Sequence, residues 1–176
     1  AAVSRAAEAL RRAGADVVEI EVPDVEELAA TYGIIVGSEA YAIHAAALAA
    51  RPDDFQPSTA ERLLAQADRT AFEYLSALRT VQRLRVSALK TMRRTYGLDA
   101  LLLATSPLRA PLLGQSEVDG AQVRTELLRL CTPFNLLGVP AVSVPARDVE
   151  GLPIGVQVAG IKLEERGVLR VAAALG

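Results

Sequence analysis

The stretch from Cys131 to Gly160 constrains the fold of this chain more than any other part of the sequence. It contains two apolar runs, Ala141–Val144 and Ile154–Ala159, and valine and isoleucine in both favour strands. Each run follows a corner marked by glycine and proline, at residues 137–140 and 151–153. Proline fixes φ and glycine allows positive φ, so such corners set the chain direction rigidly. The stretch therefore predicts two strands that are entered through tight turns.

The second of these strands is predicted to have two unlike faces, because successive side chains of a strand point to opposite sides. One face carries Ile154, Val156 and Val158, and the other carries Gly155, Gln157 and Ala159. The second set is small or polar. This composition favours close approach of backbone, a helix or a ligand on that side of the sheet.

The rest of the chain alternates between helical and strand patterns, which predicts the α/β class without an internal domain boundary. Asp16–Val22 alternates as a strand, and Leu98–Ala104 is typical of a buried central strand. Asp24 is expected to cap one helix and Ser58 another, the latter with Glu61 in a capping box. Helices are predicted at residues 3–13, 24–50, 58–67, 70–96, 122–130 and 164–175, and residues 115–120 are predicted to form a polar loop. The apolar stripe of the longest helix is expected to include the following positions: Phe72, Leu75, Leu78, Val81 or Gln82, Leu84 or Arg85, and Leu89.

Composition and short motifs limit the kinds of partner and cofactor that the chain is expected to bind. The 176 residues carry a net charge of −2, so no nucleic-acid partner is expected despite an arginine-rich segment at residues 58–96. The apolar stretches are interrupted well before about 20 residues, so no membrane span is expected. The single cysteine, Cys131, excludes an internal disulfide and fits a cytoplasmic setting. No cofactor is expected, because the sequence contains neither a dinucleotide nor a P-loop motif. No metal is expected either, because it contains no cluster of metal ligands.

The spacing of several short elements resembles the end of the amidase signature family, serine hydrolases of C–N bonds with a Ser–cis-Ser–Lys triad. The first is a Thr-x-x-x-Asn-x-x-Gly-x-Pro-Ala element that begins at Thr132. A Val-Pro strand end follows at residues 144–145, and then a Gly-Leu-Pro-x-Gly-x-Gln element begins at residue 151. Upstream, Glu39-Ala40-Tyr41 with His44 and the segment from Pro57 to Leu64 resemble other parts of the same family. The resemblance covers roughly residues 16–176.

The resemblance implies the C-terminal portion of the amidase signature fold, a mixed sheet flanked by helices that forms part of a single amidase domain. The triad is not expected in this chain, since neither Lys90 nor Lys162 has a suitable context and no Ser-Ser or Ser-x-Ser pair occurs. The chain also opens on Ala1 inside a helical pattern. We therefore expect residues 1–176 to be a C-terminal part whose N-terminal catalytic half is absent, and we expect no catalytic residue and no activity in the chain alone. His44 is interpreted as a hydrogen-bonded structural residue and Cys131 as a buried, inert thiol.

The resemblance implies that this half supplies part of a pocket wall for a small-molecule amide substrate. The candidate residues follow the predicted strands or precede them: Thr105, Ser106, Pro107, Thr132, Phe134 and Asn135. Each has a structural alternative, in which Thr132 and Asn135 satisfy turn backbone and Phe134 belongs to the core. Gln157 is expected to hydrogen-bond backbone across strands.

Two other functions stay open at this point. The chain could belong to the family's tRNA-dependent glutamyl-tRNA amidotransferases, although Arg129 stands where their amidase-like subunits are expected to have an acidic residue. It could also belong to a non-catalytic scaffold. In each case a half-sheet leaves apolar edges uncovered, which favours self-association of the chain.

Overall fold

The computed structural model describes residues 2–22, 24–118, 120–147 and 152–176. These residues form two compact units, Asp24–Leu84 and a second unit that joins Ala1–Pro23 to Arg85–Gly176. The boundary between Leu84 and Arg85 lies inside one continuous helix, where no glycine, proline or polar linker marks it. This is why no division was predicted from the sequence.

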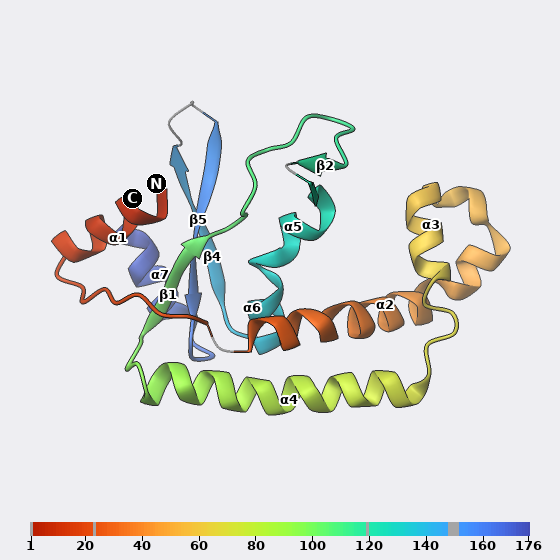
Figure 1. Cartoon of the computed structure of the whole chain (residues 1–176), viewed down its shortest axis with the longest axis horizontal. Coiled ribbons are helices and arrows are strands. Elements are labelled where there is room, and N and C mark those ends of the chain that lie inside the picture. The colour runs from red at the N-terminus through yellow and green to blue at the C-terminus, as the bar shows by residue number, and fades with distance from the viewer. Residues whose placement is uncertain (1, 23, 119, 148–151) are drawn as a thin grey trace. The chain divides into compact units, whose positions relative to one another are not determined.

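The second unit is built on a sheet of three strands in the order β1-β5-β4: β1 (Ala100–Ala104), β5 (Pro153–Gly160) and β4 (Ala141–Arg147) (Figure 1). The three predicted strands are therefore neighbours. Both pairings are antiparallel, so a parallel pair of the expected mixed sheet is not found among the strands of the described residues. β1 lies at an edge rather than at the centre, and only Leu101 of β1 is buried. The strand with two neighbours is β5.

The register of the strands separates an apolar face from a mixed one. Leu103, Gln157 and Ser143 stand opposite one another and share the mixed face, whereas Val156 and Val144 share the apolar face. The apolar face is covered by α1 (Ala2–Arg12) and α7 (Glu165–Ala173), and a Cβ on Gly160 would lie 3.0 Å from a methyl group of Val168. The mixed face is approached by α5 (Val123–Arg129) and α6 (Thr132–Leu137), which Figure 1 shows on the other side of the sheet.

Two helix ends in this unit have the geometry that their glycines predict. After α1, Gly14 has a φ of 91°, and the N–H groups of Gly14 and Ala15 donate to carbonyls of the last turn, both at 3.0 Å. This is a Schellman ending. After α6, Gly138 has a φ of 68°, and Arg85 Nη2 donates to the Leu136 carbonyl at 2.9 Å. Arginine at a helix C-terminus satisfies a free carbonyl and complements the helix dipole.

The predicted strand at Asp16–Val22 is wrong. Residues 15–22 have no regular structure, and Val18 is half exposed. The predicted polar loop at residues 115–120 is partly wrong, because two short strands pair there, β2 (Glu117–Val118) and β3 (Ala121–Gln122). The short helix α6 was not predicted, although its Pro133 occupies a position in the first turn that suits proline.

The first unit contains α2 (Val25–Ala50), the 3-10 turn η1 (Pro52–Asp54), α3 (Pro57–Leu64) and the first part of α4 (Ala71–Arg94). Asp24 precedes α2 but makes no side-chain cap bond. α3 begins at Pro57 and is preceded by Gln56, so Ser58 is not its N-cap and the predicted capping box with Glu61 does not form. Proline fits the first position of a helix, and it places the start of α3 before Ser58.

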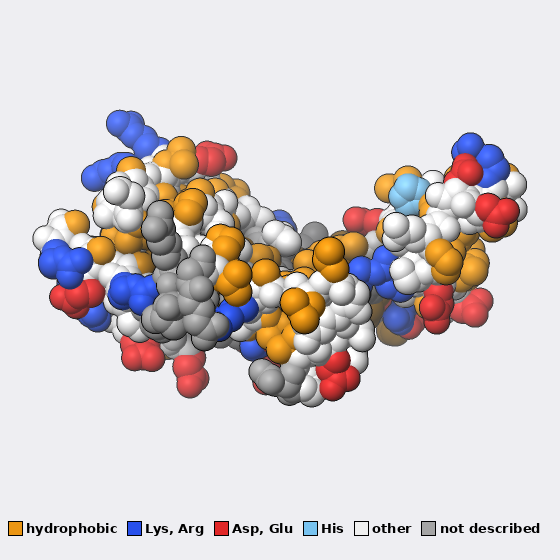
Figure 2. Space-filling view, turned by 90° about the horizontal axis from the view of Figure 1, so that it is seen from above, with side chains coloured by type: hydrophobic (Ala, Val, Ile, Leu, Met, Phe, Trp, Pro, Cys, Tyr) orange, Lys and Arg blue, Asp and Glu red, His pale blue; other side chains and the backbone are white. Residues whose placement is uncertain are grey.

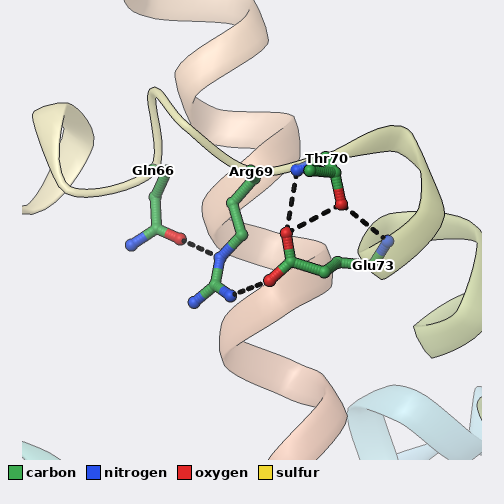
Figure 3. A network of polar contacts seen from close by, with 4 residues as sticks. All are labelled: Gln66, Arg69, Thr70 and Glu73. Carbon is green, nitrogen blue, oxygen red and sulfur yellow. Dashed lines mark hydrogen bonds and ion pairs between the residues drawn. The ribbon is translucent and has the colours of Figure 1, made fainter.

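A capping box forms instead at the start of α4, where Thr70 and Glu73 satisfy each other's backbone (Figure 3). The Thr70 N–H donates to Glu73 Oε2 at 2.9 Å, and the Glu73 N–H donates to Thr70 Oγ1 at 3.2 Å. Arg69 donates to the other carboxylate oxygen of Glu73 at 2.8 Å and to Gln66 Oε1 at 3.2 Å. The hydrogen bonds from Thr70 and then the Arg69 guanidinium lower the pKa of Glu73 from 4.5.

The buried stripe of α4 agrees with the predicted one at Val81 and Leu84 and differs from it elsewhere. Its buried side chains recur at helical spacing: Ala77, Val81, Leu84, Ala88 and Met92. Phe72 and Leu75 are exposed. Tyr74 and Arg83, on other faces of α4, reach α2, where Tyr74 Oη donates to Glu39 at 2.9 Å and Arg83 forms an ion pair with Glu27. The hydrogen bond to the Glu39 carboxylate raises the pKa of Tyr74 above 10.0.

By length and composition alone, α2 could cross a membrane, which the sequence pattern did not suggest. Its first turn carries Glu26 and Glu27, Glu39 lies near its middle, and the rest of the helix is rich in alanine and isoleucine. Core helices of soluble proteins meet the same criterion, so the length of α2 does not make it a membrane span.

Candidate functional site

The mixed face of the sheet carries a pair of hydroxyl groups that come from its two outer strands. Thr105 directly follows β1, and its N–H donates to the Gly155 carbonyl at 3.0 Å, which extends the ladder by one residue. Ser143 lies in β4. The oxygen atoms Thr105 Oγ1 and Ser143 Oγ are 2.6 Å apart, a hydrogen bond that passes over the intervening strand β5.

Gly155 makes this bridge possible because it has no side chain between the two hydroxyls. A Cβ at Gly155 would lie 2.6 Å from Thr105 Oγ1 and would also clash with Ser143 Oγ. The small face of this strand was expected to lie close to backbone, a helix or a ligand, and at Gly155 the expected partner is wrong. The groups that approach Gly155 are side chains of the neighbouring strands.

Two further hydrogen bonds attach the α5–α6 junction to the same face. Cys131 Sγ donates to the Thr105 carbonyl at 3.3 Å, and Gln157 Nε2 donates to the Leu130 carbonyl at 3.1 Å. Cys131 is half-buried rather than fully buried as expected. Gln157 is buried and does bond backbone, but the carbonyl belongs to the end of α5 and not to a neighbouring strand.

The structure brings together only part of the predicted substrate wall. Thr105 lies in the hydroxyl bridge, and Ser106 and Pro107 follow it, half-buried, at the end of β1. Ser106 Oγ accepts the Leu108 N–H at 3.2 Å, which is a local turn bond.

The other three predicted residues lie on α6. Thr132 is 5% exposed and its hydroxyl donates to the Leu128 carbonyl at 2.8 Å, so its hydrogen bond is structural. Phe134 is 2% exposed and belongs to the core. Asn135 is exposed. The alternative roles given above for Thr132 and Phe134 are the ones that their contacts favour.

Sequence reasoning missed Ser143 and Gly155 as parts of one arrangement. The sequence indicates each of them only as a member of a strand. Residues 143 and 155 are diagonal neighbours in the β4–β5 ladder, and the sequence does not give the register of that ladder. The available signal was a serine in an apolar strand near a glycine in the next one.

The bridge is uncharged and contains no activated nucleophile. Ser143 Oγ bonds a threonine hydroxyl, which is not a base, and a serine hydroxyl is a weak nucleophile without one. In the part of the chain that the structure describes, neither Lys90 nor Lys162 bonds a serine, and no group of three metal-binding side chains occurs. His44 is exposed and makes an edge contact with Phe55 at 6.0 Å between ring centres, without the expected hydrogen bond. These features describe an uncharged, hydrogen-bonded cluster on the mixed face of an α/β sheet.

Comparison with known proteins places the chain in a family. The family profile for Amidase matches residues 1–169. The chain is 32% identical over 173 residues to a fatty acid amide hydrolase of Arabidopsis thaliana, covering 92% of this chain and 27% of that protein. It is 30% identical to a glutamyl-tRNA(Gln) amidotransferase subunit of Rhizorhabdus wittichii, covering 94% of this chain and 38% of that protein. A solved amidase superposes with a TM-score of 0.88 at 37% identity, covering 98% of this chain and 40% of that chain.

The chain therefore belongs to the amidase family, as the spacing of its sequence elements predicted. It spans between about a quarter and two fifths of the length of these relatives.

Proposed function

We propose that this chain forms one wall of the active site of an amidase that hydrolyses a carboxylic amide to an acid and ammonia or an amine. In this proposal a serine on polypeptide outside the chain attacks the amide carbonyl, and the amine leaves with a proton delivered through a lysine. Water then hydrolyses the acyl-enzyme. The face that carries Thr105 and Ser143 borders the bound acyl group.

The observation that carries the proposal is the uncharged hydroxyl bridge between Thr105, directly after β1, and Ser143 in β4, in a chain of this family. Family membership supports amide chemistry. The lack of a serine–lysine contact among the described residues supports a nucleophile and base located elsewhere. The partial coverage of the relatives is consistent with additional polypeptide in the intact enzyme.

A chimera tests the proposal. This chain would replace the equivalent segment, 40% of the chain, in the solved amidase to which it is 37% identical. We expect the folded chimera to release ammonia from an amide substrate of the recipient enzyme, and we expect the purified 176-residue chain to release none. A chimera that folds by circular dichroism but is inactive would contradict the proposal, and so would inhibitor-sensitive hydrolysis by the chain alone.

A role in a tRNA-dependent amidotransferase is the second candidate, because relatives named as glutamyl-tRNA(Gln) amidotransferase subunits match with similar identity. Arg129 opposes it. This residue stands where an acidic group was expected, and its Nε donates to Glu126 at 2.8 Å, so a cation occupies the position. Binding of tRNA or of partner subunits by the intact protein would favour the amidotransferase.

A reducing, cytoplasmic setting is part of the proposal. Its support is the free thiol of Cys131, the only cysteine of the chain.

A further inference from the structure

Thr105 uses each of its polar groups to hold a different segment of the mixed face. Its N–H donates to the Gly155 carbonyl in β5 at 3.0 Å. Its carbonyl accepts the Cys131 thiol, at the start of α6, at 3.3 Å. Its hydroxyl bonds Ser143 in β4 at 2.6 Å. Among the six predicted wall residues, all of them in the described part of the chain, only Thr105 has hydrogen bonds to all three segments.

The segments that meet at Thr105 lead into the rest of the candidate wall. Ser106 and Pro107 continue from Thr105 itself, and α6 begins directly after Cys131. A displacement of Thr105 would therefore move the loop after β1 and the start of α6 relative to β4. Small displacements at a reacting centre lower rates strongly, because catalysis depends on the orientation of the bound substrate.

We propose that Thr105 is a positioning residue of the amidase site, which sets the spacing between the loop after β1, the start of α6 and β4. The effect on amide hydrolysis rests on the proposed function. The structural role of Thr105 concerns this chain alone. It assigns Thr105 a role that requires no contact with substrate.

Cys131 provides a direct readout of this arrangement, since it is the only cysteine in the chain and its thiol bonds Thr105. The half-buried thiol reacts with an alkylating reagent when the contact opens locally. The alkylation rate of the folded chain with iodoacetamide, followed by intact mass, therefore reports the stability of the contact. Removing the hydroxyl bridge should raise this rate.

The variants are Thr105→Val, which keeps the β-branched shape without the hydroxyl, Ser143→Ala, and Thr105→Ser, which keeps the hydroxyl. We expect Thr105→Val and Ser143→Ala each to raise the alkylation rate roughly threefold. This factor lies near the low end of the range for the loss of one hydrogen bond, because Ser143 is exposed. The double variant should match the single ones, because both remove the same bond. Thr105→Ser should restore the rate of the parent chain.

Thr125→Val is the matched control, since Thr125 is exposed on α5 and its side chain has no hydrogen bond in the described structure. Its rate should equal that of the parent chain. The proposal is overturned if Thr105→Val and Ser143→Ala leave the rate unchanged, or if Thr105→Ser behaves like Thr105→Val. Unfolding of Thr105→Ser would also overturn it, because the retained hydroxyl is predicted to suffice.

The same substitutions in the chimera separate this inference from the proposed function. If the chimera is an amidase, Thr105→Val should lower kcat/KM roughly tenfold, and kcat should fall with it. Thr105→Ser should recover both values. An inactive chimera refutes the proposed function while the alkylation result still stands. An active chimera in which Thr105→Val leaves kcat/KM unchanged refutes the positioning role.

Discussion

At the scale of single residues, the candidate site depends on an absent side chain as much as on the hydroxyls. Glycine in the interior of a strand is unfavourable relative to residues with a side chain to pack. In β5 it is placed where a Cβ would meet both Thr105 Oγ1 and Ser143 Oγ. The loss of packing at Gly155 is offset by a hydrogen bond that joins two strands that are not neighbours.

Gly155→Ala is therefore predicted to destabilise the fold by about 1–3 kcal/mol, as overpacking does where the neighbours cannot move freely. Urea unfolding of the Gly155→Ala variant and of the parent chain measures this difference. Gly167→Ala is the control, because Gly167 lies in helix α7 and a Cβ there meets nothing within 4 Å. It should stabilise the chain by about 0.5–1 kcal/mol. Equal stability of Gly155→Ala and the parent chain would show that the bridge does not depend on glycine.

Thr105 could be located from the sequence because it follows a predicted strand, and the ends of strands commonly carry site residues. The partner of Thr105 could not. Ser143 and Gly155 come close only through the register of β4 on β5, and a shift of one residue would send Ser143 to the apolar face. The structural roles of Thr132 and Phe134 could be foreseen as alternatives but not chosen, because burial decides them.

At the scale of elements, the helix starts show how one residue overrides a motif. The pattern Ser/Thr-x-x-Glu occurs twice, at Ser58 and at Thr70. Only Thr70 and Glu73 form the capping box, whereas Pro57 occupies the first helical position of α3 and moves Ser58 inside the helix. A proline that precedes the pattern was the signal that distinguished the two cases.

The Glu73 cap predicts a pH dependence. The pKa of Glu73 is lowered in the folded chain, first by the hydrogen bond from the Thr70 N–H. A carboxyl whose folded pKa lies below its unfolded value stabilises the fold fully above the unfolded value, here 4.5, and this contribution is lost as the pH falls through the folded pKa. Glu73→Gln should therefore be less stable than the parent at neutral pH, and the difference should shrink on acidification below 4.5. Urea unfolding of both chains at neutral pH and below pH 4.5 measures this difference in stability.

Glu61→Gln is the control for this experiment, because Glu61 lies in the pattern that forms no box. Its stability relative to the parent should not depend on pH in the way that Glu73→Gln does. A Glu73→Gln difference that stays constant, or grows, as the pH falls would contradict the cap.

Strand predictions failed where alternation was the only evidence. Residues 16–22 alternate as well as any strand here, but they pair with no strand in the described chain. A strand requires a neighbour for its backbone hydrogen bonds, and a local pattern does not supply one. For Leu98–Ala104 the strand itself was predicted correctly, but its position in the sheet was not. The apolar run indicated a central strand, whereas β1 lies at an edge of the sheet. β5 was predicted well because its alternation and its internal glycine indicate the same strand, whereas Gly151 of its predicted entry turn lies outside the described residues.

At the scale of the whole molecule, many large apolar side chains remain exposed, and Figure 2 shows hydrophobic side chains across the face that it views. They include Ile43, Phe72, Leu112 and Leu113, which are between 74% and 105% exposed. Exposed apolar surface on this scale favours association. We therefore retain the proposal that the chain alone associates with itself.

Sedimentation velocity of the 176-residue chain over a range of concentrations tests this proposal. The sedimentation coefficient should rise with concentration, and the chimera, in which additional polypeptide covers apolar surface, should not show the rise. A chain that stays a single monomeric species at every concentration would contradict self-association.

The central claim is that this chain contributes a wall to an amidase site and that the reactive serine lies on other polypeptide. The most direct measurement is to trap the active chimera with a fluorophosphonate, which phosphonylates an activated serine with loss of fluoride, and to map the adduct by peptide mass spectrometry. The account predicts an adduct on a serine of the recipient portion and none on the eight serines of this chain. An adduct on Ser143, or on any other serine of this chain, would contradict it.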